Sequence, residues 1–299
     1  MNILVSGSTG LLGSALLPAL NATGHQVTRL VRSDAGASGP VVLWDPQAGF
    51  LETKGLEGLD AVVHLAGENI AAGRWTAAQK ARIRESRVKG THLLSTALSQ
   101  MHSPPKVFAC ASAIGFYGNR GEEILREEST CGPGFLAEVC RDWEEAASIA
   151  ARKGIRVVHF RFGVILSPKG GALAKMLLPF RLGLGGVVGS GKQYMSWISL
   201  EDAARAALHA LNTPTLQGPL NLVAPNPVRN REFTKSLGRA LSRPTLFPMP
   251  AFAARLAFGE MADDLLLASA RVVPAKLESS GFSFLFPELA GALRHLLQK

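Results

Sequence analysis

Three glycines separate an apolar run from a stretch of helical periodicity near the start of the chain. Met1–Ser6, which precedes them, has the length and apolar character of a short buried strand. Leu11–Ala22, which follows them, repeats apolar residues at helical spacing. Gly7, Gly10 and Gly13 therefore form a turn between a first strand and a first helix, which restricts the chain to folds that begin with this unit.

The same alternation continues through the N-terminal half. The expected strands are short and almost continuously apolar, as in sheets that are covered on both faces. They are His25–Val31, Pro40–Leu43, Asp60–Leu65, Lys106–Ala111 and Ile155–Phe160, and the expected helices are Thr76–Leu98 and Phe135–Lys153. Strands that alternate with helices indicate βαβ units with right-handed crossovers. We therefore predict an α/β fold with a doubly wound parallel sheet.

The spacing of the glycines is typical of a loop that binds the diphosphate of a dinucleotide. The first glycine permits a sharp turn, the second lets the backbone approach a pyrophosphate, and the third lets helix and strand pack closely. Amides at the helix N-terminus then face the phosphates, and Thr9 adds a hydroxyl donor. The predicted contacts are Gly7, Thr9, Gly10, Leu11, Leu12 and Gly13. The alternative is a plain glycine-rich turn.

The end of the second expected strand distinguishes NAD from NADP. An NAD site usually places Asp or Glu there to hold the ribose 2′-hydroxyl. This strand instead ends in Arg32 and Ser33, and the first acidic residue is Asp34. Arg32 can donate a charged fork to a 2′-phosphate and stack on adenine, with Ser33 assisting. We therefore predict NADP(H) as the cofactor, with a solvated surface arginine as the alternative for Arg32.

The order of elements is less regular after about residue 166. Expected here are helices at Ala172–Leu182 and Leu200–Leu211 and a strand at Pro219–Val223, followed by mostly helix from Asn226 onward. We predict a Rossmann domain of residues 1–165, to which residues 195–225 return. Residues 166–194 and 226–299 are predicted to form a smaller, mainly helical lobe on the substrate side.

Composition and charge exclude several classes of protein. Hydrophobic residues make up 47% of the chain, which is enough for a substantial core. The formal net charge is +9, but the basic residues form no run, so we expect an anionic cofactor or substrate rather than nucleic acid. No apolar stretch reaches the ~18 charge-free residues of a membrane span, and no signal peptide is evident. We expect a cytoplasmic monomer or homodimer without membrane contact.

The cysteines do not indicate a disulfide framework or a metal site. Cys110, Cys131 and Cys140 are odd in number and lack the spacing of zinc ligands. We therefore predict no bound metal. Cys110 lies in an apolar run and is interpreted as a core residue, with a reactive thiol as the alternative.

Longer motifs follow several of the expected strands. They read His64-Leu-Ala-Gly67, Ser112-Ala-Ile-Gly-Phe-Tyr117-Gly118, Arg161-Phe-Gly-Val164 and Trp197-Ile-Ser-Leu-Glu-Asp202. Together with the glycine loop, they make the chain resemble the extended short-chain dehydrogenase/reductase family, in its nucleotide-sugar epimerase/dehydratase-like group. Residues 65–70, 177–186 and 259–263 resemble the "epimerase family" branch of that group, which has its own short C-terminal domain. The resemblance covers essentially the whole chain.

The resemblance implies further cofactor contacts. It places Leu65, Ala66 and Gly67 on the adenosine–ribose side of the cofactor, and Val164 near the nicotinamide. The family usually has Asn in an Asn-Val-x-Gly-Thr element, where this chain has Arg87. Arg87 either reaches a cofactor phosphate or ribose, or forms a salt bridge with Glu85 or Glu68.

The same family catalyses through a Tyr-x-x-x-Lys pair and a nearby Ser or Thr. The lysine lowers the pKa of the tyrosine, which then acts as general acid and base. The helix that should carry this pair, Phe135–Glu144, has neither residue, and the only tyrosines of the chain are Tyr117 and Tyr194. The Ser/Thr position falls on Ala113, with Ser112 one residue earlier.

Three interpretations of the function remain open. The first is an NADP(H)-dependent oxidoreductase or epimerase that uses another acid, for which Arg141 is a further option and Cys140 one that needs a perturbed pKa. Its candidate catalytic residues are Ser112, Tyr117, Glu138 and Asp142. Glu138 and Asp142 share a helical face, which is alternatively a solvated edge. The second is a catalytically silent NADP(H)-binding regulator or scaffold. The third, nucleic-acid binding, lacks an aromatic-interleaved basic stripe.

A glycine-rich stretch in the second half predicts part of a cleft wall. It covers Gly183–Gly191 and continues to Trp197. Tyr194 and Trp197 are candidates to stack on a small-molecule substrate, and Arg181 and Lys192 to attract its anionic group. The alternative is that both aromatic side chains are packing residues, which we favour for Trp197.

Overall fold

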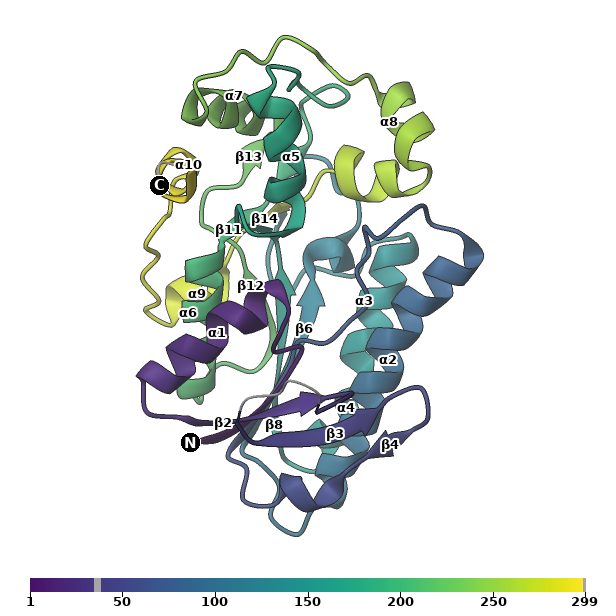
Figure 1. Cartoon of the computed structure of the whole chain (residues 1–299), viewed down its shortest axis with the longest axis vertical. Helices are drawn as coiled ribbons and strands as arrows, with labels where there is room; N and C mark the ends of the chain where they lie inside the picture. The colour runs from purple at the N-terminus through teal and green to yellow at the C-terminus, as the bar shows by residue number, and fades with distance from the viewer. Residues whose placement is uncertain (35–38, 298–299) are drawn as a thin grey trace. The chain divides into compact units, whose positions relative to one another are not determined.

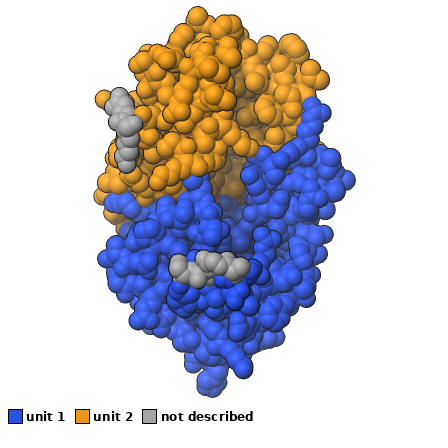
Figure 2. All heavy atoms as spheres, viewed as in Figure 1, with its two compact units in different colours: residues 1–112, 139–161, 204–220 blue, residues 113–138, 162–203, 221–299 orange. Residues whose placement is uncertain are grey.

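The computed structural model describes residues 1–34 and 39–297. It divides into two compact units, which Figure 2 colours separately. Unit 1 consists of Met1–Ser112, Val139–Arg161 and Ala204–Leu220, and unit 2 of Ala113–Glu138, Phe162–Ala203 and Asn221–Lys299. None of the helices in the described ranges is both long enough and apolar enough to cross a membrane.

Unit 1 is built on a mostly parallel eight-stranded sheet (Figure 1). From edge to edge its strands are β12 (Gly218–Leu222), β8 (Arg156–Phe162), β6 (Val107–Ala113), β5 (Ala61–His64), β1 (Asn2–Ser6), β2 (Gln26–Val31), β3 (Val41–Asp45) and β4 (Phe50–Leu51). The chain therefore runs from β1 outward to β4, and then from β5 outward to the other edge. The predicted α/β fold with a doubly wound sheet is confirmed.

The central strand β1 is buried along its length. Ile3, Leu4 and Val5 are fully buried, and the strand pairs in parallel with β2 on one side and β5 on the other. Apolar side chains that point to both faces are needed because helices cover the sheet on both sides. Leu94 and Leu98 from α2 (Ala77–Gln100) belong to this core. The continuous apolar runs of the sequence are explained by this double burial.

The remaining helices of unit 1 are α1 (Leu11–Ala22), η1 (Thr53–Leu56), α4 (Ser148–Arg152) and most of α6 (Leu200–Asn212), and α3 (Phe135–Glu145) spans the boundary between the units. The single helix expected over Phe135–Lys153 is wrong, because the chain breaks it into α3 and α4. At the break the amide of Ala147 bonds to the carbonyl of Glu144, three residues back, at 3.2 Å. The amide of Ala150 also donates to Ser95 Oγ of α2 at 2.9 Å, so tertiary packing replaces a continuous helix.

Unit 2 is mainly helical, with short paired strands. Its helices are η2 (Ile114–Tyr117), α5 (Gly171–Arg181), α7 (Asn230–Ala240), α8 (Ala251–Phe258), η3 (Asp263–Leu267), α9 (Ala275–Ser279) and α10 (Leu289–Leu297). Its strand pairs are β9 (Val164–Leu166) with β11 (Trp197–Ser199), β10 (Tyr194–Met195) with β13 (Val228–Arg229), and β7 (Ile124–Leu125) with β14 (Arg271–Val272). Trp197, Phe233 and Leu289 are central to its core. The helical lobe predicted for the C-terminal part is therefore present.

Hydrogen bonds from Arg156 of β8 connect the sheet to the C-terminal end of α6. Its guanidinium donates to the carbonyl oxygens of Ala210 at 3.1 Å, Leu211 at 2.9 Å and Leu216 at 2.6 Å. Carbonyls at the end of a helix lack intrahelical partners and carry partial negative charge, so a cation is favourable there.

We predict that Arg156→Met lowers the free energy of unfolding by about 2–3 kcal/mol, because three carbonyls lose a charged donor. Urea unfolding followed by tryptophan fluorescence measures this change. Arg152→Met is the matched control, since Arg152 is exposed and donates one bond to Ser148. Equal losses for the two variants would contradict the prediction.

Candidate functional site

The glycine loop joins the carboxyl end of β1 to α1. Gly7 has a φ of +65°, and a Cβ atom there would lie 2.8 Å from the backbone nitrogen of Ala66. A Cβ atom at Gly13 would lie only 2.2 Å from the carbonyl oxygen of Gly7. The amide of Gly10 closes the turn by donating to the same oxygen at 3.0 Å. The loop therefore needs glycine at both positions. Gly7 is needed for the backbone conformation, and Gly13 is needed for close packing.

The N-terminus of α1 is open to a ligand. Gly10 is its N-cap residue and supplies no side-chain cap, and the first turn contains no acidic residue. The first amides of a helix, here those of Leu11 and Leu12, have no carbonyl partner within the helix. Together with the positive end of the helix dipole, they favour an anion at this position. Thr9 is exposed beside them.

A second loop follows the neighbouring strand β5. Leu65 and Ala66 are half-buried, and Gly67 is exposed. Because β1 and β5 are adjacent and parallel, their carboxyl ends lie at the same edge of the sheet. The order of the strands reverses between them, and ligands of doubly wound sheets bind at such a reversal. The two predicted loops are thus brought together.

A buried hydroxyl joins the two loops. Ser6 Oγ, at the end of β1, lies 2.6 Å from His64 Nδ1 at the end of β5. The same oxygen accepts hydrogen bonds from the amides of Leu65 at 3.1 Å and Ala66 at 3.3 Å. Since two amides occupy its acceptor positions, the hydroxyl donates its hydrogen to Nδ1, and His64 carries its own hydrogen on Nε2. The hydrogen bonds of Ser6 therefore hold the two loops in register.

His64 is neutral in this network. Its side chain is fully buried, and this burial lowers its pKa from 6.5 to about 3. The edge of the imidazole meets the ring of Trp44, with 5.6 Å between the ring centroids. Gly90 of α2 lies against both rings: a Cβ there would be in tight contact with Trp44, at 3.3 Å, and in ordinary van der Waals contact with His64 Nε2, at 3.5 Å.

Arg32 and Ser33 directly follow β2, the other neighbour of β1. Both residues are exposed, as is Asp34. Their strand ends at the same edge of the sheet as β1 and β5, since all three are parallel. Arg32 and Ser33 therefore follow β2 at the edge of the sheet where the glycine loop follows β1, and the first carboxylate, that of Asp34, is two residues beyond Arg32.

Arg87 of α2 lies against the loop after β5. Its guanidinium donates to the carbonyl oxygens of Ile83 and Glu68, each at 3.0 Å. It also lies over the ring of Trp143, 5.0 Å from the centroid. Glu85, one of the two expected acidic partners, instead bonds to Lys89.

In unit 2, Val164 is the first residue of β9 and pairs with Trp197. It is half-buried.

Ser112 is part of a buried ion-pair network. Its hydroxyl donates to Glu144 Oε1 of α3 at 2.7 Å. Arg161 of β8 donates to both oxygens of Glu144, each at 2.8 Å, and the two charged side chains are only 4% and 12% exposed. A two-pronged pair of this kind is strong and fixed in direction. It binds the end of β6 to α3 and β8, and the Ser112 hydroxyl is engaged in it.

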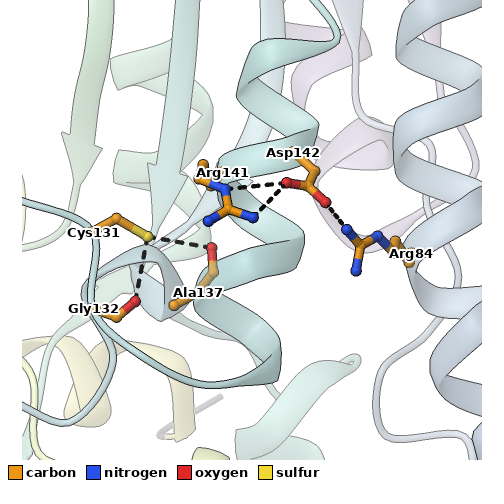
Figure 3. A network of polar contacts seen from close by, with 6 residues as sticks. All are labelled: Arg84, Cys131, Gly132, Ala137, Arg141 and Asp142. Carbon is orange, nitrogen blue, oxygen red and sulfur yellow. Dashed lines mark hydrogen bonds and ion pairs between the residues drawn. The ribbon is translucent and has the colours of Figure 1, made fainter.

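Asp142, which precedes Glu144 by two residues on α3, is held by two arginines. Figure 3 shows its carboxylate between Arg84, which comes from α2, and Arg141. Arg141 Nη2 lies 3.1 Å from Asp142 Oδ1. The carboxylate is thus paired on both oxygens rather than solvated. Glu138, the other carboxylate of the expected pair, is exposed and makes no side-chain bond found within residues 1–34 and 39–297.

Tyr117 is a core residue of unit 2. Its side chain is fully buried, and its hydroxyl donates to Asn221 Oδ1 at 2.7 Å. Leu125, Val223 and Val272 pack around it. The hydroxyl is therefore shielded from solvent by its own unit.

The cysteine thiols are engaged or buried. The thiol of Cys131 donates to the carbonyls of Gly132 at 3.4 Å and Ala137 at 3.6 Å (Figure 3). Burial, with a smaller contribution from Glu144, raises the pKa of the Cys110 thiol well above its ordinary value. Cys110 therefore stays protonated, as a core residue does.

The expected cleft-wall segment places Tyr194 between two arginines. The guanidinium groups of Arg229 and Arg271 each lie 5.0 Å from the centre of its ring. Trp197 is fully buried, and its indole donates to the carbonyl of Asn226 at 3.1 Å, so it is a packing residue. Arg181 and Lys192 are exposed.

Sequence reasoning missed four of these charged residues: Glu144, Arg161, Arg229 and Arg271. One signal was available, because Arg161 directly follows the expected strand Ile155–Phe160 and stands next to Phe160 and Phe162, and a buried cation requires a buried partner. The identity of that partner is not visible in the sequence, since Glu144 lies 17 residues away on a helix. The role of Ser6 was missed because a serine in a buried strand has no distinctive spacing.

Comparison with known proteins places this arrangement in a family. The model of the NAD dependent epimerase/dehydratase family matches residues 3–222, and that of a domain of unknown function (DUF1731) matches residues 249–296. The chain belongs to the NAD-dependent epimerase/dehydratase family. Its relatives include an epimerase family protein of Mycobacterium tuberculosis, 47% identical over 94% of this chain and 93% of the relative. The human epimerase family protein SDR39U1 is 37% identical over 99% of this chain and 100% of the human protein.

Solved structures of family members share the fold. Human SDR39U1, crystallised with NADPH, matches all of both chains at 36% identity with a TM-score of 0.92. A nucleoside-diphosphate sugar epimerase from Corynebacterium glutamicum matches 99% of this chain and 58% of its own, at 37% identity with a TM-score of 0.82. The resemblance to the extended short-chain dehydrogenase/reductase group, in its epimerase family branch, is thereby confirmed.

We predict that His64 makes the stability of the protein depend on pH. The unfolded chain binds a proton at His64 below pH 6.5, whereas the folded protein resists protonation down to about pH 3. The stabilising contribution is thus complete above pH 6.5 and is lost as the pH falls through this window, by about 1.4 kcal/mol per pH unit.

Urea unfolding of the wild type and of His64→Gln at several pH values measures this dependence. The slope well below pH 6.5 should be smaller in the variant by this same amount, about 1.4 kcal/mol per pH unit. His102→Gln, which changes an exposed histidine, should leave the slope unaltered. Identical slopes for the wild type and His64→Gln would rule out the buried neutral imidazole.

Proposed function

We propose that this chain binds NADP(H) at the carboxyl ends of β5, β1 and β2 in unit 1. The observation that carries the proposal is the NADPH-bound structure of human SDR39U1, which matches the whole chain with a TM-score of 0.92. The local geometry supports it, because a Cβ atom at Gly7 or Gly13 would collide with backbone atoms that shape the loop. Such a loop suits a diphosphate that approaches the backbone closely.

Each part of the dinucleotide has a proposed partner among the residues predicted from the sequence. The diphosphate is expected on the glycine loop, at the open amides of α1. Arg32 and Ser33 are expected to hold the 2′-phosphate, since no carboxylate ends β2 to repel it. Leu65, Ala66 and Gly67 are proposed to line the adenosine–ribose side, and Val164 to lie near the nicotinamide.

Arg87 is proposed to act on the cofactor through the backbone. Its two hydrogen bonds to the carbonyls of Ile83 and Glu68 hold the segment that follows Gly67 against α2. Its side chain is also close to Gly67, where a Cβ atom would lie 3.5 Å from the guanidinium carbon. A guanidinium in this position fixes the loop on which the ribose would rest.

For the reaction, we favour an NADP(H)-dependent oxidoreductase or epimerase that acts on a small molecule with an anionic group. Arg271 beside Tyr194 supports an anionic substrate, because this cation borders a stackable ring. Arg229, which contacts the same ring, is already paired with Glu122 at 2.7 Å. When bound, the cofactor supplies or accepts hydride. Among the four candidate acid–base residues, Glu138 alone offers an exposed carboxylate that is not already paired.

A specific observation also favours the second candidate, a silent NADP(H)-binding protein. Ser112 and Tyr117 are buried with their hydroxyls engaged, and Asp142 is paired with two arginines. The Tyr-x-x-x-Lys pair of the wider family is missing as well. A protein with this set of residues can respond to the cofactor without turning over a substrate.

We predict that Arg32→Ala weakens NADPH binding by roughly 10- to 100-fold, the effect of losing charge-assisted bonds to one phosphate. NADH binding should change by less than about threefold, because NADH lacks the 2′-phosphate. Isothermal titration calorimetry of both nucleotides measures the two effects, with Arg152→Ala as a surface control. Equal weakening of both nucleotides would exclude the proposed contact.

We predict that the protein oxidises bound NADPH with at least one member of a panel of anionic aldehydes, ketones and keto sugars. Glu138→Gln should then reduce kcat by about 100-fold or more while leaving NADPH affinity unchanged, as for loss of a general acid. Glu145→Gln on the same helix is the control, because Glu145 is also exposed. Tight NADPH binding without turnover on any compound supports the silent protein instead.

A further inference from the structure

Basic residues recur at every fourth position along α7 and just beyond its end: Arg231, Lys235, Arg239 and Arg243. A step of four residues rotates only about 40° around a helix, so the first three share one face. The opposite face carries Phe233 and Leu237, which are buried in the core of unit 2. The side of α7 that remains exposed is therefore cationic.

The cationic face is not neutralised by nearby acids. Glu232 is the one acidic residue between positions 226 and 245, and its carboxylate accepts the amide of Arg229 at the start of the helix. Lys235 and Arg239 are exposed and make no side-chain hydrogen bond or ion pair with the described part of the chain. Like charges four residues apart destabilise a helix, so helix stability does not account for them.

A hollow of about 430 Å³ lies at the C-terminal end of this face. It is lined by Lys235, Gly238, Arg239, Ser242, Arg243, Pro244 and Thr245, without any carboxylate. Ser242 has a φ of +53°, and this turn brings the amide of Arg243 back to the carbonyl of Gly238 at 2.9 Å. Three basic residues thus border one opening, an arrangement that suits a phosphate group.

Exposed apolar side chains adjoin the hollow. They are Leu182, Leu184, Leu246 and Phe247, with exposed fractions between 55% and 75%. Arg243 Nε donates to the carbonyl of Arg181 at 2.9 Å, which joins the loop after α7 to the end of α5. The amide of Phe247 donates to the carbonyl of Gly185 at 3.4 Å, so the two apolar segments are held together. Figure 1 shows α5 and α7 at the same end of unit 2.

We propose that this surface docks on a bilayer that contains anionic phospholipid. The basic-apolar surface consists of Lys235, Arg239 and Arg243 together with Leu182, Leu184, Leu246 and Phe247. A bilayer presents phosphates and, just beneath them, an apolar boundary, so it complements both halves of the surface. Nucleic acid would match the cations but leave the leucines in water.

The sequence alone predicts no membrane contact, because neither an apolar span nor a basic run exists. Three residues separate each cation from the next. The cations therefore come together on one surface only because the segment is helical. The proposal concerns contact with the bilayer surface and is independent of the cofactor site in unit 1. Failure of the vesicle experiment below would therefore leave the proposed NADP(H) binding intact.

The test is co-sedimentation of the full chain with vesicles. Neutral phosphatidylcholine vesicles are compared with vesicles in which about one third of the lipid is phosphatidylglycerol. Binding to the anionic vesicles should be at least about tenfold stronger, and about 0.5 M NaCl should weaken it. Equal binding to both vesicles, or binding to neither, would overturn the proposal.

Two pairs of substitutions test the two halves of the surface. Lys235→Gln with Arg239→Gln should reduce binding by roughly tenfold or more, and Leu246→Ser with Phe247→Ser should reduce it similarly. The matched controls are Lys54→Gln with Lys153→Gln, and Phe50→Ser, which change exposed residues of unit 1. Binding that persists in the surface variants, or is equally lost in the controls, contradicts the assignment.

The same variants distinguish the bilayer from two other partners of this surface, a second copy of the chain and nucleic acid. Light scattering shows whether Leu246→Ser with Phe247→Ser dissociates an oligomer, and a gel-shift assay with a generic RNA shows whether the cations bind nucleic acid. An oligomer that uses this surface, or RNA binding that is stronger than vesicle binding, would reject the bilayer as the occupant.

Discussion

The close approach of two loops at the carboxyl ends of β1 and β5 is the constraint on which the rest of unit 1 depends. The backbone at Gly7 lies so near Ala66 that a single Cβ atom would come within 2.8 Å of its nitrogen. Ser6 makes this approach favourable, because one hydroxyl donates to His64 and accepts two amides of the facing loop. Without this hydroxyl, His64 Nδ1 and the amide of Ala66 would lose their partner, at a cost of about 1–3 kcal/mol each, whereas the amide of Leu65 would keep its bond to the carbonyl of Ser6.

The sequence predicts well those features that depend on neighbours along the chain. Gly7 and Gly13 are local requirements of a turn, and continuously apolar runs such as Ile3–Val5 report burial on both faces. Features that join distant residues were not predicted. Tyr117 bonds to Asn221, 104 residues away, and the break between α3 and α4 accompanies a contact between Ala150 and Ser95. Nothing in a local pattern specifies such partners.

Charge was the least predictable property, for the same reason. A sequence gives the number of charges but not their pairing, and the pairing determines which charges are available. The expected carboxylate pair on α3 is divided in the structure, since Asp142 is held by two arginines and Glu138 is exposed. Conversely, cations that are scattered in the sequence share one face of α7, because a spacing of four approximates the helical period.

Cofactor binding and catalysis therefore have different physical support in this protein. The edge proposed for the cofactor is formed by backbone atoms, namely glycine turns and open amides, which tolerate change at most other positions. Catalysis would need a side chain that can exchange a proton, and the buried pair of Glu144 and Arg161 has both carboxylate oxygens occupied. Removing one member of such a pair leaves an uncompensated buried charge, which costs about 3–5 kcal/mol. Stability alone therefore explains this pair, so its presence does not argue for turnover.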